Sequence, residues 1–351
     1  MTSWQPRIEP VDPADQAAFA AFYDVFTASQ VHDRPDTFTP PGAEAMRDNI
    51  LQAPDNDRYD LFVAHDAGVP AAGVPAAAGQ LRRDMTANRH LAMLSVDVHP
   101  RHRRRGFGSA MLARLEAAAV AAKRTACYVE TAVPPGVAVE ESGEYAFAAK
   151  HGYRLALVEQ QRQLDLPINV DLAALADEAA RHHGGYQIVT FQSGVPDEHL
   201  AGFAALMALI GAESPTGDVE FEPEDPDPRF VRQREARRRA RGQGDFGAIA
   251  LSPGGEVVAT TRMTETLGDA TKITQGGTIV RHDHRGHRLG VAVKIANLRQ
   301  LGPAHSCVTT WNAAANGPMI AINEALGFRL IEQGAGYQKL IPARDQAHSP
   351  V

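Results

Sequence analysis

Two segments of the chain repeat one pattern, in which a strand-like run, a basic turn with glycine and a helix-like run follow one another. The first segment covers residues 94–109 and the second covers residues 277–290. Apolar residues then recur at helical spacing, and each helix-like run is followed by a strand-like run that begins at Cys127 or Cys307. Because an internal repeat of this kind indicates a duplicated fold, we expect two similar domains.

The ends of the two copies also correspond. Each copy closes with a short helix-like run that ends at a glycine followed by an aromatic residue, Gly152 before Tyr153 and Gly327 before Phe328. Glycine suits the left-handed residue that ends many helices. Alternating strands and helices predict an α+β fold, with a mixed α/β sheet flanked by helices in each domain.

The length of 351 residues exceeds the usual size of a single domain. We therefore expect one domain at residues 1–166 and a second at residues 186–342. Residues 167–185, which include a helix-like stretch, are the expected connector, and residues 343–351 are expected to form a flexible tail.

Composition narrows the class of protein. The net charge of −7 argues against attraction to nucleic acid phosphates, and we interpret the arginine-rich run Arg229–Arg241 as a solvated helix face. Residues 1–13 lack the pattern of a secretory signal, and no apolar stretch reaches the roughly 20 residues needed to cross a bilayer. Two cysteines without close-set partners predict no metal site. A cytoplasmic protein without a membrane span, monomeric or homodimeric, is expected.

The basic turn Arg103–Gly108 lies between a strand and the start of a helix. The first turn of a helix presents unpaired backbone N–H groups, and glycine lets a phosphate approach the chain, so this turn is typical of a diphosphate site. A dinucleotide-binding turn is the alternative, but the third glycine of that pattern is missing. A nucleic-acid site is disfavoured by the acidic net charge.

This order of strand, Arg-x-x-Gly-x-Gly turn and helix resembles the coenzyme A loop of the GCN5-related N-acetyltransferase (GNAT) superfamily. The resemblance covers most of residues 91–155 and again 274–340. It implies two tandem GNAT domains that use acetyl-coenzyme A. The implied reaction is direct acetyl transfer, without a covalent enzyme intermediate, to a primary amine of a small molecule or a peptide N-terminus, as in natural-product tailoring or resistance. The layout is similar to that of the mycothiol synthases, whose second domain catalyses, and this similarity favours chemistry in the second copy.

The resemblance also implies which residues hold the coenzyme, with strand residues on its pantetheine arm and the basic turn on its diphosphate. In the first copy these residues are Val96, Asp97, Val98, Arg103, Arg104, Arg105, Gly106, Phe107, Gly108 and Ser109. In the second copy they are Thr278, Ile279, Val280, Arg285, Gly286, His287, Arg288, Leu289, Gly290 and Asn316. Arg288 stands where the family has glycine, and a left-handed arginine costs about 1 kcal/mol relative to glycine. Whether both copies bind the coenzyme stays open.

The catalytic groups are less clearly marked. Glu130 lies within an apolar strand and is the candidate general base of the first copy, with an ordinary solvated or paired glutamate as the alternative. Tyr145 could supply the proton to the leaving thiolate there, or could be a core residue. In the second copy Asn323 stands at the position of the family's tyrosine, and Glu265 and Asp269 are candidate bases. Because these positions depart from the family's catalytic residues, a non-catalytic acyl-coenzyme A sensor or scaffold is the alternative function.

Overall fold

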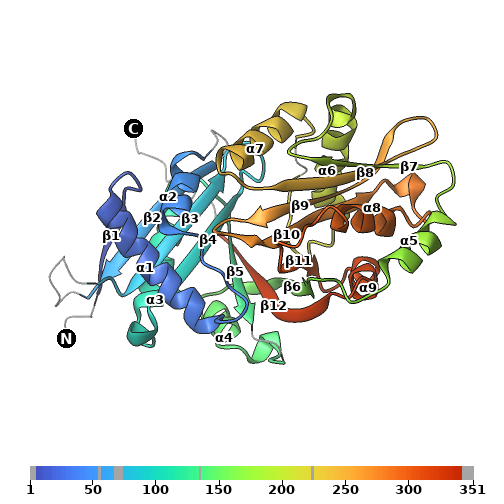
Figure 1. The fold of residues 1–351 in the computed structure, drawn as a ribbon. Helices are drawn as coiled ribbons and strands as arrows, with labels where there is room; N and C mark the ends of the chain where they lie inside the picture. The colour runs from blue at the N-terminus through green and yellow to red at the C-terminus, as the bar shows by residue number, and fades with distance from the viewer. Residues whose placement is uncertain (1–4, 54–56, 67–73, 134–135, 223–224, 342–351) are drawn as a thin grey trace. The chain divides into compact units, whose positions relative to one another are not determined.

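The computed structural model of the chain describes residues 5–53, 57–66, 74–133, 136–222 and 225–341. The tail expected at 343–351 lies outside these residues. The chain divides into two compact units (Figure 1). Unit 1 contains Met1–Leu157 together with Gly334–Val351, and unit 2 contains Val158–Gln333.

Unit 1 is built on a mixed sheet with the strand order β1-β2-β3-β4-β5-β12. The first four strands are antiparallel neighbours, and β4 and β5 are parallel. The strands are β1 (Arg7–Val11), β2 (Asp57–His65), β3 (Ala77–Asp84), β4 (Leu91–Val98), β5 (Ala126–Val133) and β12 (Arg329–Leu340).

Helices flank the sheet of unit 1. They are α1 (Gln16–Asp33), α2 (Ala43–Leu51), α3 (Phe107–Ala121) and α4 (Gly143–Lys150), with short 3₁₀ turns η1 (Pro100–His102) and η2 (Val139–Glu141). Asp15 begins α1, because its carboxylate accepts the backbone N–H groups of Ala17 and Ala18. The buried residues Phe19, Phe22 and Val25 of α1 then pack with the apolar side chains of β2 and β3.

Unit 2 repeats this plan with the strand order β6-β11-β10-β9-β8-β7. Its strands are β6 (Arg154–Asp165), β7 (Gln187–Gln192), β8 (Asp245–Leu251), β9 (Val257–Thr266), β10 (Asp269–Val280) and β11 (Cys307–Ala313). Its helices are α5 (Leu172–Ala180), α6 (Leu200–Glu213), α7 (Pro228–Ala240), α8 (Leu289–Leu298) and α9 (Gly317–Ala325), with 3₁₀ turns η3 (Asp197–His199) and η4 (His282–His284). The mixed strand pairing and flanking helices of both units confirm the predicted α+β fold.

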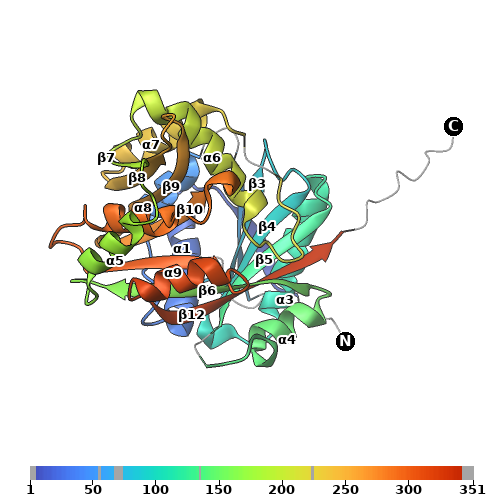
Figure 2. The ribbon, with the colours of Figure 1, turned by 90° about the vertical axis from the view of Figure 1, so that its right-hand side faces the viewer.

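Among the described residues of unit 1 there is no helix that corresponds to α5. Residues 167–185 were expected to connect two domains, but they lie within unit 2. Leu172 and Leu175 of α5 pack against the core cluster that contains Ile295 and Leu298 of α8, and Figure 2 shows the two helices next to each other. The segment is therefore a structural part of unit 2.

Each unit contains a strand that belongs by sequence to the other copy. Most of β12 lies in unit 1, and most of β6 lies in unit 2. Residues 334–340 of β12 lie in unit 1, where β12 neighbours β5 and the N–H of Ile341 donates to the carbonyl of Thr125. Conversely, β6 pairs with β11 of unit 2, from Glu159 opposite Ala313 to Asp165 opposite Cys307. The compact units consequently do not follow the sequence order in which we placed the domains.

The glycines at the ends of α4 and α9 adopt the predicted conformation. Gly152 has φ of 79° and Gly327 has φ of 91°. The following N–H groups reach back into the helix, from Tyr153 to the carbonyl of Ala148 and from Phe328 to that of Asn323. Each helix therefore ends through a left-handed residue, as the sequence indicated.

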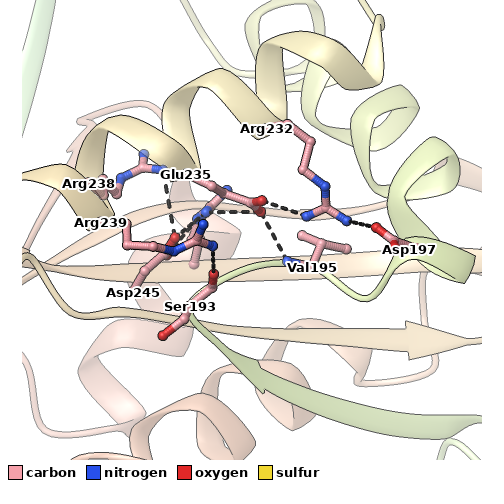
Figure 3. A network of polar contacts seen from close by, with 9 residues as sticks. Ser193, Val195, Asp197, Arg232, Glu235, Arg238, Arg239 and Asp245 are labelled. Carbon is pink, nitrogen blue, oxygen red and sulfur yellow. Dashed lines mark hydrogen bonds and ion pairs between the residues drawn. The ribbon is translucent and has the colours of Figure 1, made fainter.

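Several arginines of α7 anchor this helix to the rest of unit 2 (Figure 3). Arg232 pairs with Glu235 at 2.5 Å and also with Asp197. The guanidinium of Arg239 donates to the carbonyl of Ser193 at 2.9 Å. The run interpreted as a solvated face thus has structural contacts on the side that meets the β7–η3 turn and the sheet.

Candidate functional site

In unit 1 the parallel strands β4 and β5 separate part of the way along. Their register runs from Leu91 opposite Ala126 to Leu94 opposite Val129, while the strands themselves continue to Val98 and Val133. On its other side β4 remains paired with β3 as far as Val98. Backbone groups alternate in direction along a strand, and the N–H of His99 bonds to Ala76 on the β3 side. The backbone groups of Val96 and Val98 therefore face the opening between the strands. The expected arm-binding residues Val96, Asp97 and Val98 lie on this part of β4.

The carboxylate of Asp97 is not available to a ligand in the opening between the strands. Asp97 is 3% exposed and accepts hydrogen bonds from Gln30 at 2.8 Å and from Ser95 at 3.0 Å. Burial raises the pKa of this carboxyl group, and these hydrogen bonds oppose the rise. The side chain of Asp97 is therefore not available to a ligand in the opening, and its backbone pairs with Ala78 of β3.

The first arginine of the basic turn holds the loop in place. Arg103 donates from Nε to the carbonyl of Val98 at 3.2 Å and pairs with Asp33 at the end of α1 at 2.7 Å. The hydrogen bond to Asp33 is the main cause that raises the pKa of the Arg103 guanidinium. Arg103 thus joins β4, the loop and α1, and it acts as a positioning residue.

The remaining residues of the loop present both backbone and charge. Arg104 with φ of 60° and Gly106 with φ of 92° are left-handed, and Gly106 precedes the first turn of α3. Arg105 pairs with Asp66. The side chains of Arg101 and Arg104 have no ion-pair partner among the described residues, and both are exposed. The loop therefore keeps two cationic groups available beside a helix N-terminus.

The start of α3 is open enough for a ligand to approach its backbone. A Cβ atom at Gly108 would contact only Val98 and Phe147, at 3.4 and 3.5 Å. Ser109 is linked to His151 of α4 by a hydrogen bond of 2.9 Å between Oγ and Nε2, so α3 and α4 are held together at this end. Phe107, in contrast, is buried at 1% exposure and belongs to the core.

Unit 2 shows the same divergence of strands. β10 and β11 are paired from Lys272 opposite Cys307 to Gln275 opposite Thr310, and β10 continues to Val280. The register of β10 with β9 shifts between Gln275 and Thr278. The expected residues Thr278, Ile279 and Val280 therefore follow an irregularity at the point of separation.

The second loop follows the backbone path of the first. Gly286 and Arg288 have φ of 86° and 56°, at the positions of Arg104 and Gly106. The predicted left-handed arginine is thus present. Arg285 repeats the anchoring of Arg103, since its Nε donates to the carbonyl of Val280 at 3.3 Å and its guanidinium pairs with Glu213 at the end of α6. Leu289 and Gly290 begin α8 and are both buried.

The charges around the two loops differ. Around the first loop, four arginines (Arg101, Arg103, Arg104 and Arg105) stand beside two paired acids (Asp33 and Asp66), which leaves a net charge of +2. Around the second loop, three arginines (Arg281, Arg285 and Arg288) stand beside four paired acids (Glu178, Glu213, Glu256 and Asp283), which leaves −1. The first loop is the better match for a diphosphate.

The candidate base lies at the opening of unit 1. Glu130 follows Val129, the last residue of β5 that pairs with β4, and is solvent-exposed. Desolvation by neighbouring atoms raises the pKa of its carboxyl group, while Tyr128 and the charge of Arg82 oppose the rise. In unit 2 the equivalent position is Thr310, whose Oγ1 donates to the carbonyl of Gln275 at 3.3 Å. Only the first opening has a carboxylate at this point among the described residues.

Two tyrosines meet near the opening of unit 1. The ring of Tyr145 on α4 lies 6.4 Å from that of Tyr337 on β12. Burial raises the pKa of the Tyr337 phenol, which has Thr131 and Ser142 as polar neighbours. Sequence reasoning missed Tyr337, because it belongs by position to the second copy and reaches unit 1 only through the exchanged strand. Its place beside β5 carries no local signal in the sequence.

The asparagines of α9 have structural partners. Asn316 precedes α9, and its side-chain oxygen accepts the N–H of Met319 at 3.3 Å. Asn323 is fully buried, and its amide donates to the side-chain oxygen of Asn312 at 2.7 Å. The structure therefore shows a helix cap and a buried amide pair where a coenzyme contact and a thiolate partner were expected.

The two acids considered as bases for unit 2 lie at the far end of β10 from its loop. Glu265 accepts the N–H of Gly244 at 2.7 Å, and Asp269 accepts the N–H and hydroxyl of Thr271. Glu265 thus binds the residue before β8, Asp269 orders the start of β10, and neither is brought to the opening. Among the described residues there is no group of three or more His, Cys, Asp or Glu side chains that could hold a metal ion. Nor does any helix in that part of the chain have the length and apolar character to cross a membrane.

Comparisons with known proteins agree with this geometry. Residues 21–153 match the model of the acetyltransferase (GNAT) family, whereas no curated protein matches the sequence. A tandem GNAT protein from the clavulanic acid biosynthesis pathway superimposes with a TM-score of 0.76 at 27% identity, over 96% of this chain and 98% of that one.

A GCN5-related N-acetyltransferase from Sphaerobacter thermophilus has the same fold, with a TM-score of 0.64 at 18% identity over 95% of both chains. This family uses acetyl-coenzyme A and amine substrates in general. The match of unit 1 to the family, together with a tandem neighbour that spans the whole chain, shows that the chain is a tandem member of the GNAT superfamily of acyltransferases.

Proposed function

We propose that the chain transfers the acetyl group of acetyl-coenzyme A to a primary amine, and that unit 1 performs the reaction. The observation that carries the proposal is the opening between β4 and β5, which leads to a loop with two unpaired arginines at the start of α3. A carboxylate with a raised pKa stands at the same opening. The layout of the mycothiol synthases favoured unit 2, but its loop has a net negative charge and its opening lacks a carboxylate.

Different residues of unit 1 would contact different parts of acetyl-coenzyme A, which supplies the acetyl group. The backbone groups of Val96 and the N–H of Val98 suit the amides of the pantetheine arm, whereas the carbonyl of Val98 accepts from Arg103. The N–H groups from Gly106 to Ser109 and the side chains of Arg101 and Arg104 suit the diphosphate. Arg103 holds the loop in the shape that presents these groups.

The reaction needs one base and one acid. Glu130 takes a proton from the ammonium or amine of the acceptor, the amine nitrogen attacks the carbonyl carbon, a C–N bond forms and the C–S bond breaks. The leaving thiolate takes a proton from the Tyr145 phenol or from water. A raised pKa brings Glu130 closer to neutral pH, where a carboxylate accepts a proton more readily.

The acceptor is proposed to be the amine of a small molecule or of a peptide N-terminus. The clavulanic acid pathway of the tandem neighbour supports a setting in natural-product tailoring. The alternative function is a sensor that binds acyl-coenzyme A without turnover. It is favoured by one observation, that Ala148 and Asn323 occupy the positions of the family's tyrosine.

Thiol release from acetyl-coenzyme A with a panel of amines tests the proposal, and Glu130→Gln tests the base. We expect the substitution to lower kcat/KM by roughly 10²-fold or more, without loss of coenzyme binding. In the unchanged chain, activity should fall as the pH drops through the raised pKa of Glu130, because the protonated carboxyl cannot accept a proton.

Glu198→Gln, at an exposed position of η3, serves as the control and should leave the rate unchanged. Full activity of Glu130→Gln would exclude Glu130 as the base. Tight binding of acetyl-coenzyme A with no thiol release for any amine would favour the sensor.

A further inference from the structure

The second loop is contacted by a segment, residues 178–186, that has no counterpart among the described residues of unit 1. Glu178 of α5 pairs with the left-handed Arg288 at 2.9 Å. A few residues further on, Nδ1 of His287 lies 3.2 Å from the carbonyl of His182. The hydroxyl of Tyr186 lies 2.8 Å from Nδ1 of His284, so the loop is contacted from residues 178 to 186 along its length.

These contacts give the left-handed arginine of the second loop a carboxylate partner, which the left-handed arginine of the first loop lacks among the described residues. Arg288 and Arg104 are the left-handed arginines of their loops, yet Arg104 has no ion-pair partner among the described residues whereas Arg288 has Glu178. The other two arginines of the second loop are paired as well, Arg285 with Glu213 and Arg281 with Glu256 and Asp283. A phosphate that approached the second loop would meet negative charge.

We propose that Glu178 prevents the second loop from binding coenzyme A, so that the chain binds one molecule, in the loop of unit 1. This inference rests on the proposed function, since it concerns the same coenzyme. The Glu178–Arg288 pair is partly exposed, with 40% and 51% of the two side chains accessible, and such a pair contributes little to stability. Its effect is on charge: without Glu178 the second loop becomes neutral overall and Arg288 becomes free.

Two substitutions test the coenzyme binding of the two loops separately. Gly108→Glu places a carboxylate against the diphosphate position of the first loop. The new Cβ meets only ordinary contacts, and an acidic residue suits the first turn of a helix, so the variant should fold. Glu178→Gln removes the charge that faces the second loop. Asp177→Asn is its matched control, because Asp177 is the neighbouring acid of α5 and has no ion-pair partner among the described residues.

Titration calorimetry with coenzyme A at low ionic strength gives the number of sites. We expect one site in the unchanged chain, none in Gly108→Glu, and one in the combined Gly108→Glu, Glu178→Gln variant. Removal of one charge at about 6 Å should tighten binding at the second loop about tenfold. The combined variant with Asp177→Asn should bind none.

Two results would overturn the inference: a remaining site in Gly108→Glu, or no site in the combined variant with Glu178→Gln. An unchanged chain that binds no coenzyme A would contradict the proposed function instead. The paired variants in the Gly108→Glu background would still test the role of Glu178.

Discussion

Lys294 is a buried cation without a counter-charge in unit 2. Its side chain is 2% exposed, it has no ion pair among the described residues, and its ammonium lies 5.8 Å from the ring of Phe328. Burial lowers the pKa of its amine to about 7. The corresponding residue of α3 in unit 1 is the apolar Leu112, which shows that the position itself suits a hydrophobic side chain.

We expect Lys294→Met to stabilise unit 2. The pKa of the lysine is lower in the folded chain than in the unfolded one, so the unfolded state binds more protons between these two pKa values and stability rises with pH there. The advantage of methionine should therefore be full below about pH 7, on the order of 4 kcal/mol, and should shrink as the pH approaches 10. Urea unfolding at several pH values measures it.

Lys150→Met, at an exposed position of α4, is the control and should show no such dependence on pH. A difference between Lys294→Met and the unchanged chain that stays constant from pH 6 to pH 10 would contradict the argument.

The conformation of Arg288 could be predicted from the sequence, because aligning the two copies places it opposite Gly106. The partner of Arg288 could not be predicted in this way. Glu178 reaches the loop only because α5 packs on α8. The sequence of a helix outside the repeat does not indicate which surface that helix packs against. The role of Asn316 as a helix cap was equally hidden, since capping and coenzyme contacts favour the same residue type.

Among the elements, α7 shows how an arginine-rich helix can be fixed by few acids. Glu235 is 3% exposed and accepts the N–H of Val195 at 3.0 Å and the guanidinium of Arg232 at 2.5 Å. Arg262 of β9 lies 3.4 Å from the same carboxylate and is bound to Asp245 at 2.8 Å. One carboxylate thus connects α7, the turn before η3 and the sheet (Figure 3).

We expect Glu235→Ala to destabilise unit 2 by about 3–5 kcal/mol, because the N–H of Val195 and the buried Arg262 would lose an acceptor. Chemical denaturation followed by the fluorescence of Trp311 on β11 measures the change. Arg229→Ala is the control and should cost little, since Arg229 is exposed and pairs with Asp227 at the start of the helix. Equal stabilities of the two variants would show that the network contributes nothing.

The existence of α7 could be read from the sequence. The inward direction of Arg232 and Glu235 could not. Charge alternation on a helix indicates solvent exposure in most chains, and only the position of the β7–η3 turn brings an acceptor and a donor to these side chains.

For the whole molecule, the exchanged strands mean that unit 1 depends on the end of the chain. Gly336 of β12 lies so close to the phenol of Tyr128 on β5 that a Cβ atom would overlap it. Tyr128 is 1% exposed and therefore has little room to move. The glycine is required by this close approach.

We expect Gly336→Ala to destabilise unit 1 by roughly 1–3 kcal/mol through overpacking, and Tyr128→Phe to restore part of the loss. Hydrogen exchange should become faster in β5 and stay unchanged in β8 and β9. Gly302→Ala, where a Cβ would meet no atom within 4 Å, is the control. Faster exchange confined to unit 2 would contradict the assignment of residues 334–340 to unit 1.

The duplication and its mixed sheets were predictable, because each copy has local motifs in the same order. The exchange was not, since the local sequence of β6 or β12 does not specify which strands it will neighbour. When residues 1–166 have been synthesised, every described helix of unit 1 is present, but β12, which neighbours β5, is not. Unit 1 must wait for residues 334–340, so the unit whose synthesis begins first receives its last strand only after all of unit 2 has been synthesised.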